Sequence, residues 1–257
     1  MSNFPFDVQI QDGEEYQTTT AKLHRIGQRG ATEDGRVFRY CRCDDTYEVD
    51  YPSWAACCTY SYNTTDLEDC VEGSVVTAAV IGGYTLDTLD SGTHGADFFA
   101  EGYAALTVGS VFFLMRIKAN TAAGASTTLT LYDPLPIDVA AASQIQIFPS
   151  VYASVASAKN IQGLNDPVKP KVCVPLVAVA DEKYFWGQTW GPCYGVPSET
   201  FPRGTNMHDL QFNSDGSVTL QKARTTESYY QRAGYRLFDY TADPTGALIL
   251  YQLELAP

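Results

Sequence analysis

The chain has 257 residues, of which 45% are hydrophobic and 12% aromatic, a composition typical of a folded protein rather than a disordered one. Its formal net charge of −13 at pH 7 argues against nucleic acid as the main partner, because phosphate binding needs clustered Lys and Arg. No segment approaches the ~20 apolar residues that a membrane-spanning helix needs, so we expect no membrane partner.

The N-terminal 20 residues are mostly polar and predict an extended arm. No basic and apolar segments of a secretory signal are present there, and the cysteine count of seven is odd, so we expect no disulfide framework. Within the arm, Phe4, Phe6, Val8 and Ile10 alternate with other residues, which is the period of a β-strand. We therefore predict that the arm adds a strand to a neighbour, with Phe4 and Phe6 as interface candidates.

Short strands are predicted between the arm and the middle of the chain, at residues 23–26, 36–42 and 75–81. The intervening segment 44–72 is rich in Asp, Glu and Tyr, and we interpret it as mostly loop.

A β-hairpin is predicted around Gly109-Ser110, a two-residue loop typical of a type II′ turn. Pairing across this turn gives one apolar face, which we expect to lie in the core. Its members are Gly102, Ala104, Leu106, Val108, Val111, Phe113, Met115 and Ile117.

The opposite face of the hairpin pairs Thr107 with Phe112, Ala105 with Leu114, Tyr103 with Arg116 and Glu101 with Lys118. This face is too apolar for a fully solvated surface. We expect a second sheet, the aromatic strand described next or a neighbouring subunit to cover it. Tyr103, Phe112, Leu114 and Arg116 are therefore interface candidates.

Further strands are predicted at residues 127–132, 144–148 and 172–174. The run KYFWGQTWGP at residues 183–192 then places large aromatic side chains on one side of a strand, which is typical of a core or an interface. Tyr184, Trp186 and Trp190 are the interface candidates in this run.

The remaining strands are predicted at residues 218–221, 235–239 and 247–255, and no helix longer than two turns is expected. We predict an all-β protein, an antiparallel sandwich or barrel-like β domain with long loops and an extended N-terminal arm. The arm covers residues 1–20, the core domain 21–200, and a C-terminal β extension packed on or next to the core covers 201–257.

No motif for catalysis is recognisable, because the chain has no nucleophile elbow, phosphate-binding loop or dinucleotide fingerprint. We predict no enzyme and no cofactor. Four of several clustered thiols are enough for a tetrahedral zinc site. The usual C-x₂₋₄-C spacing is missing, however, so we favour buried reduced thiols over a metal. The thiols concerned are Cys41, Cys43, Cys57, Cys58 and Cys70.

Three blocks carry a family resemblance: GQRGATEDGRVFRY at residues 27–40, FFAEGYAALTVG to TTLTLYDPL at 98–135, and VPLVAVADEKYFWGQTWGPC at 174–193. In this order they resemble virion structural proteins of tailed bacteriophages, in particular capsid decoration and minor head proteins. Residues 41–72 and 201–257 fall outside the resemblance.

The resemblance implies a non-enzymatic decoration or cement protein that binds the major capsid protein and stabilises neighbouring capsomers. It also implies a homotrimer on the capsid exterior of the virion, assembled in the host cytoplasm. One alternative is a head fibre or receptor-binding protein that recognises host glycans through Trp186 or Trp190. A virion-associated hydrolase is the less favoured second alternative.

Overall fold

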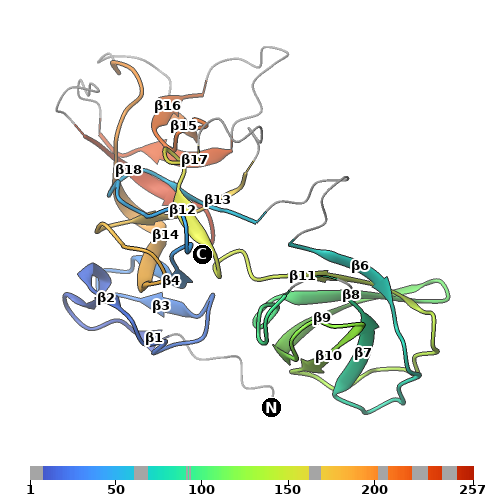
Figure 1. The fold of residues 1–257 in the computed structure, drawn as a ribbon. Coiled ribbons are helices and arrows are strands. Elements are labelled where there is room, and N and C mark those ends of the chain that lie inside the picture. Colours follow the sequence, from blue (N-terminus) through green and yellow to red (C-terminus); the bar gives the residue numbers. More distant parts are fainter. Residues whose placement is uncertain are drawn as a thin grey trace. The chain divides into compact units, whose positions relative to one another are not determined.

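The computed structural model describes residues 8–60, 69–90, 92, 94–161, 169–201, 208–221, 231–238 and 248–257 (Figure 1). Over these residues the fold is all-β, as predicted, with one short 3₁₀-helix, η1 (Glu14–Tyr16). No helix in these ranges has the length and apolarity that a membrane span requires.

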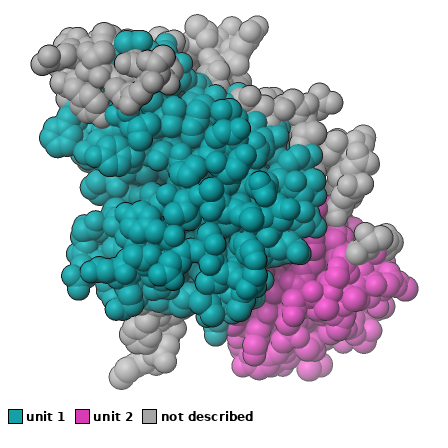
Figure 2. Space-filling view, turned by 60° about the vertical axis from the view of Figure 1, so that its left-hand side comes forward, with its two compact units in different colours: residues 1–59, 152–257 teal, residues 60–151 magenta. Residues whose placement is uncertain are grey.

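The chain divides into two compact units, which Figure 2 shows in different colours. Unit 1 comprises residues 1–59 and 152–257, and unit 2 comprises residues 60–151. We expected one core domain over residues 21–200, with 201–257 as an extension. The division falls elsewhere because strands from both ends of the chain share one sheet, while the middle of the chain builds a separate sheet with its own core.

Unit 1 contains a large sheet whose central strand, β14 (Tyr184–Gly195), pairs with strands that lie far from it in the sequence. The main path of the sheet has the order β1-β3-β4-β14-β18-β17-β15-β16. Its other strands are β1 (Val8–Gln9), β3 (Arg29–Ala31), β4 (Val37–Arg42), β15 (Asp209–Phe212), β16 (Val218–Leu220), β17 (Arg232–Arg236) and β18 (Ile249–Glu254).

The N-terminal arm is a part of unit 1 from residue 8 onward. Val8 pairs in parallel with Gly30 of β3, and the Ile10 side chain is buried. Strand β2 (Thr18–Thr19) pairs with the start of β14. From residue 8 onward, the arm therefore adds its strands to the sheet of its own chain rather than to a neighbouring molecule. Phe4 and Phe6 lie outside the residues that the structure describes.

The two ends of unit 2 connect to adjacent strands of unit 1. Strand β5 (Ala56–Cys58) pairs with both β12 (Val155–Ser157) and β13 (Lys171–Pro175). Just beyond this pairing, the Thr59 N–H donates to the Ser154 carbonyl oxygen at 3.0 Å. Unit 2 is therefore inserted between neighbouring positions of unit 1, an arrangement that compact domains with adjacent termini allow.

Asp44 holds this insertion point together. One carboxylate oxygen accepts hydrogen bonds from the N–H groups of Thr46 and Tyr47, and the other accepts from the hydroxyls of Thr59 and Ser154. Burial by itself would raise the pKa of Asp44, but these hydrogen bonds outweigh it and hold the pKa below its ordinary value.

Unit 2 is a six-stranded antiparallel sheet with the order β6-β11-β8-β9-β10-β7, visible in Figure 1 as a curled sheet. Its edges meet: Val75, directly after β6, bridges to Thr88 of β7, and the Val76 N–H donates to the Asp87 carbonyl oxygen at 2.7 Å. The strands are β6 (Val71–Ser74), β7 (Thr85–Leu89), β8 (Tyr103–Val108), β9 (Val111–Asn120), β10 (Ser126–Leu131) and β11 (Gln144–Phe148).

Glycine permits this barrel-like closure. A Cβ on Gly73 of β6 would come within 2.8 Å of the Leu89 carbonyl oxygen, so a larger residue would force β6 and β7 apart. The enclosed core is mainly aliphatic, with Leu86, Leu106 and Ile117 among its fully buried side chains beside Phe99. The expectation of a barrel-like β domain is therefore met by unit 2.

Two predicted strands are wrong. Residues 23–26 form no strand, and residues 75–81 make only isolated bridges, whereas the strands of this region are β6 before them and β7 after them. The apolar run at 75–81 is misleading because Val80 and Ile81 are exposed rather than buried. A third strand, predicted at residues 235–239, begins earlier in the chain, because the observed strand is β17 (Arg232–Arg236).

Candidate interaction face of unit 2

The β8–β9 hairpin has the predicted register. Val108 pairs with Val111, Leu106 with Phe113, and Tyr103 with Arg116. Gly109 at the turn has a φ of 62°, the left-handed conformation that glycine adopts without a steric cost.

The face predicted to be core points into the barrel. Leu106, Met115 and Ile117 are buried, and Phe113 packs partly buried against the same cluster. Val111 is the exception, with 47% of its surface exposed, because it lies beside the turn at the end of the hairpin. The alternation of the sequence therefore identifies the inner face correctly along most of its length.

The opposite face is exposed, although we expected it to be covered. Phe112 is 79% exposed, Leu114 70% and Tyr103 47%. Among the described residues of unit 2, no second layer covers these three side chains. Cover by a neighbouring subunit stays a prediction. Side chains of this size rarely lie together on the surface of a monomer without an interaction role.

Arg116, the fourth candidate on this face, is engaged within unit 2. Its guanidinium donates to the Glu101 carboxylate, which also accepts a hydrogen bond from the Tyr132 hydroxyl. The guanidinium carbon lies 5.0 Å from the centre of the Tyr132 ring. Arg116 therefore fixes the base of the hairpin.

The predicted pair of Glu101 with Lys118 is wrong, because the strand is irregular at this point. Glu101 and Gly102 both oppose Ile117: the Glu101 N–H donates to the Ile117 carbonyl oxygen at 2.9 Å, and the Ile117 N–H donates to the Gly102 carbonyl oxygen at 3.0 Å. This extra residue, with Glu101 at a φ of 65°, turns the Glu101 side chain toward Arg116.

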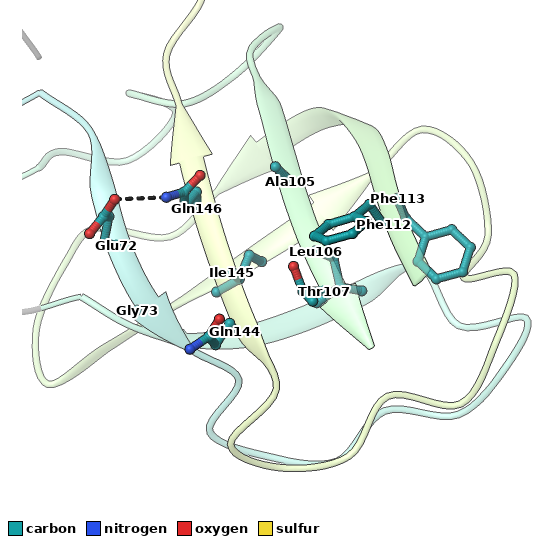
Figure 3. Close-up of a pocket in the computed structure, with 10 residues that line it drawn as sticks. All are labelled: Glu72, Gly73, Ala105, Leu106, Thr107, Phe112, Phe113, Gln144, Ile145 and Gln146. Carbon is teal, nitrogen blue, oxygen red and sulfur yellow. Dashed lines mark hydrogen bonds between the residues drawn. The ribbon is translucent and has the colours of Figure 1, made fainter. Parts of the chain in front are cut away.

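A groove of about 510 Å³ lies on the outer face of the sheet, beside Phe112 (Figure 3). Its floor includes the small side chains of Ala105 and Thr107 on β8. Phe112 rises from β9 on one side, and Gln144 and Gln146 rise from β11 on the other. The result is a trough with one apolar wall and one amide wall.

Glu72 of β6 extends the amide wall, because its carboxylate accepts a hydrogen bond from the Gln146 side-chain amide at 2.7 Å. It is the charged residue among the groove's lining residues. The sequence did not identify Gln144 and Gln146 as site candidates, because a groove depends on strands that only the fold places side by side.

The charge of unit 2 is strongly negative. Arg116 and Lys118 are the Lys and Arg residues in the sequence 60–151, and Arg116 is paired with Glu101. The acidic residues of this segment are Asp66, Glu68, Asp69, Glu72, Asp87, Asp90, Asp97, Glu101, Asp133 and Asp138. A partner of positive charge is therefore favoured electrostatically.

The aromatic candidates of β14 belong to unit 1. Trp186 is 2% exposed, and its ring nitrogen donates to Glu14 at 3.2 Å. Tyr184 is half-buried and stacks on Tyr40 at 5.8 Å between ring centres, and Trp190 is half-buried as well. Trp186 is therefore a core residue rather than an interface residue.

The seven cysteines form no disulfide and are buried. Burial raises the pKa of the Cys43 thiol to about 12 and that of Cys57 to about 11, which suits unreactive structural thiols. Within the ranges that the structure describes, His, Cys, Asp and Glu side chains form no group of three or more that could hold a metal ion.

A buried acid–imidazole pair lies in unit 2. Nδ1 of His94 is 3.2 Å from a carboxylate oxygen of Asp90, and the imidazole contacts the rings of Phe98 and Phe99 at 4.7 and 4.8 Å between centres. The same carboxylate accepts the Gly92 N–H at 2.9 Å. The pair lies in the segment between β7 and β8, where the His94 ring packs against two phenylalanines of the same segment.

Comparisons with family models, with curated proteins and with solved structures found no match for this chain.

Proposed function

We propose that this protein is a non-enzymatic structural protein of a tailed-phage virion, which decorates the capsid surface and attaches through the outer face of the β8–β9 hairpin. The observation that carries this proposal is the exposure of Phe112 and Leu114, at 79% and 70%, on a strand whose register is otherwise closely specified. Burying a large apolar side chain stabilises a complex by roughly 1.5–3 kcal/mol. Two such anchors are a reasonable centre for an interface.

The hairpin lies within residues 98–135, one of the blocks that resemble decoration and minor head proteins. A decoration protein needs a rigid scaffold and a complementary surface rather than a reaction centre. Unit 2 has both features: a closed apolar core and an outer face that exposes Phe112 and Leu114. The partner proposed is the major capsid protein, and the trimeric state and the location on the capsid exterior follow from the resemblance.

The test is attachment to particles. Phage particles that lack this protein are incubated with the purified chain, washed and analysed by quantitative mass spectrometry. We expect many copies per particle for the wild type, and loss of attachment for the double variant Phe112→Ser with Leu114→Ser. Phe238→Ser is the matched control, because Phe238 is 61% exposed but belongs to unit 1.

Either of two results would contradict the proposal: a wild-type protein that is absent from native virions or present in only a few copies, or a double variant that attaches as the wild type does. Thermal unfolding of both variants, compared with the wild type, verifies that a loss of attachment comes from the surface and not from unfolding.

For the alternative function, a receptor-binding protein for host glycans, the structure favours a different sugar-binding residue from the predicted Trp186. Trp186 is buried and Trp190 half-buried, whereas Phe112 is an exposed ring beside the amide groups of Gln144 and Gln146. A glycan array probed with the wild type and with Phe112→Ser separates this alternative from capsid attachment.

A further inference from the structure

The trough beside Phe112 is built from two consecutive rows of residues across the sheet. In one row Gln144 pairs with Thr107, which pairs with Phe112. In the next row Gln146 pairs with Ala105, which pairs with Leu114, a residue outside the groove lining that continues the apolar side of the face. The amide wall, the small floor and the apolar wall therefore each repeat at every second residue of a strand.

This repeat has a defined length. Residues i and i+2 of a strand are separated by about 6.6–6.8 Å, since the rise is about 3.3–3.4 Å per residue. An extended polypeptide that runs along β8 has the same period. Every second side chain points the same way, and so does every second peptide N–H and C=O group. A primary amide both donates and accepts hydrogen bonds, so Gln144 and Gln146 match the N–H and C=O groups of such a chain.

We propose that the trough binds an extended peptide segment of the partner, whose alternate apolar side chains lie against Phe112 and Leu114 while its main chain bonds to Gln144 and Gln146. This inference rests on the proposed function, because it specifies which part of the capsid partner unit 2 contacts. The exposure of the two apolar residues and the small side chains of Ala105 and Thr107 leave space for a chain in the groove.

The charge of the trough indicates which charged residues the bound peptide segment contains. Glu72 is the charged residue of the lining, and the nearby cation Arg116 is already paired with Glu101. A Lys or Arg in the segment beside Glu72 gains a favourable interaction, whereas an Asp or Glu is repelled. The partner segment is therefore an alternating apolar and polar chain with at least one basic residue.

The experiment uses the full chain and three synthetic ten-residue peptides. The first alternates Leu with Thr and carries one central Lys, the second has the same composition with the Leu residues in one block, and the third has Glu in place of Lys. Binding is followed by NMR through the side-chain NH₂ signals of Gln144 and Gln146. We expect these signals to shift with the alternating Lys peptide, and more weakly with the other two.

Two variants locate the binding. Gln144→Ala with Gln146→Ala removes the amide wall, and we expect an affinity for the Lys peptide lower by about fivefold or more, because each lost hydrogen bond weakens binding. Glu72→Gln is expected to reduce the preference for the Lys peptide over the Glu peptide. Gln17→Ala with Gln221→Ala is the matched control, since both residues are exposed in unit 1.

Maltohexaose, a neutral oligosaccharide, is titrated in parallel. Shifts of Gln144 and Gln146 with the sugar alone, no shifts with any peptide, or equal affinities for the alternating and blocked peptides would each overturn the inference. If the peptides fail while attachment to particles still requires Phe112 and Leu114, the proposed function stands without this inference. If attachment is also independent of these two residues, both fail.

Discussion

Trp186 of unit 1 and Phe112 of unit 2 lie on strands with a similar alternation but differ in burial. In unit 1, Trp186 and Phe38 are buried, and Trp186 bonds to Glu14 of η1. In unit 2 the core is mainly aliphatic, with Phe99 buried in it, and Phe112 and Leu114 lie on the surface. The comparison teaches that strand alternation alone does not decide whether a large apolar side chain is buried.

The sharpest test of this comparison is Trp186→Ala. Removal of a buried aromatic side chain costs about 3–5 kcal/mol of folding free energy, because it leaves a cavity and here also removes the hydrogen bond to Glu14. We expect a loss of this size in chemical denaturation followed by fluorescence. A cost below about 1 kcal/mol would mean that Trp186 is accessible, and the contrast between the units would fail.

The next effect concerns the point where unit 2 is inserted. We expect Asp44→Asn to cost about 1–3 kcal/mol, because the hydroxyls of Thr59 and Ser154 then face an amide instead of a carboxylate. The measurement is the free energy of unfolding, compared with that of Asp45→Asn, an exposed neighbour.

The same variant has a predicted pH dependence. The pKa of Asp44 is lowered in the folded protein, so its stabilisation is fully present above the ordinary value of 3.8 and is lost as the pH falls through the lower folded value. The difference in unfolding free energy between wild type and Asp44→Asn should therefore be constant near neutral pH and shrink below about pH 4. A difference that grows on acidification would contradict this assignment.

A smaller effect is expected at the hairpin turn of unit 2. Gly109→Ala places a Cβ in the left-handed conformation at a φ of 62°, which costs roughly 1–2 kcal/mol. Nothing lies within 4 Å of the added Cβ, so the cost comes from the backbone alone. Thermal unfolding is the measurement, and Ala105→Gly, a change in the same hairpin away from the turn, is the comparison.

The smallest effect on stability is expected for Phe112→Ser. Because the ring is 79% exposed, we expect a change within about 0.5 kcal/mol, together with the loss of partner binding described above. Leu106→Ala, which removes a buried side chain from the neighbouring strand, should instead cost about 2–5 kcal/mol. Similar costs for the two variants would show that the outer face contributes to folding.

Local pattern was sufficient for the hairpin. The predicted partners of Tyr103, Leu106 and Val108 are the observed ones, because a two-residue turn and alternating side chains define the register between adjacent segments. The same reasoning failed at Glu101, where an extra residue interrupts the strand and turns the carboxylate toward Arg116. It also failed for residues 75–81, whose apolar run lies between two strands instead of forming one.

By itself, the sequence determined the all-β class, the hairpin register and the separation of its two faces, since the two-residue period of a strand is a local property. Only the tertiary structure decided which faces are covered. The same alternation places Trp186 in a core, where strands from both ends of the chain meet, and Phe112 on the outside of a sheet that closes on itself. Burial depends on contacts between segments far apart in the sequence, and no period within a single strand contains that information.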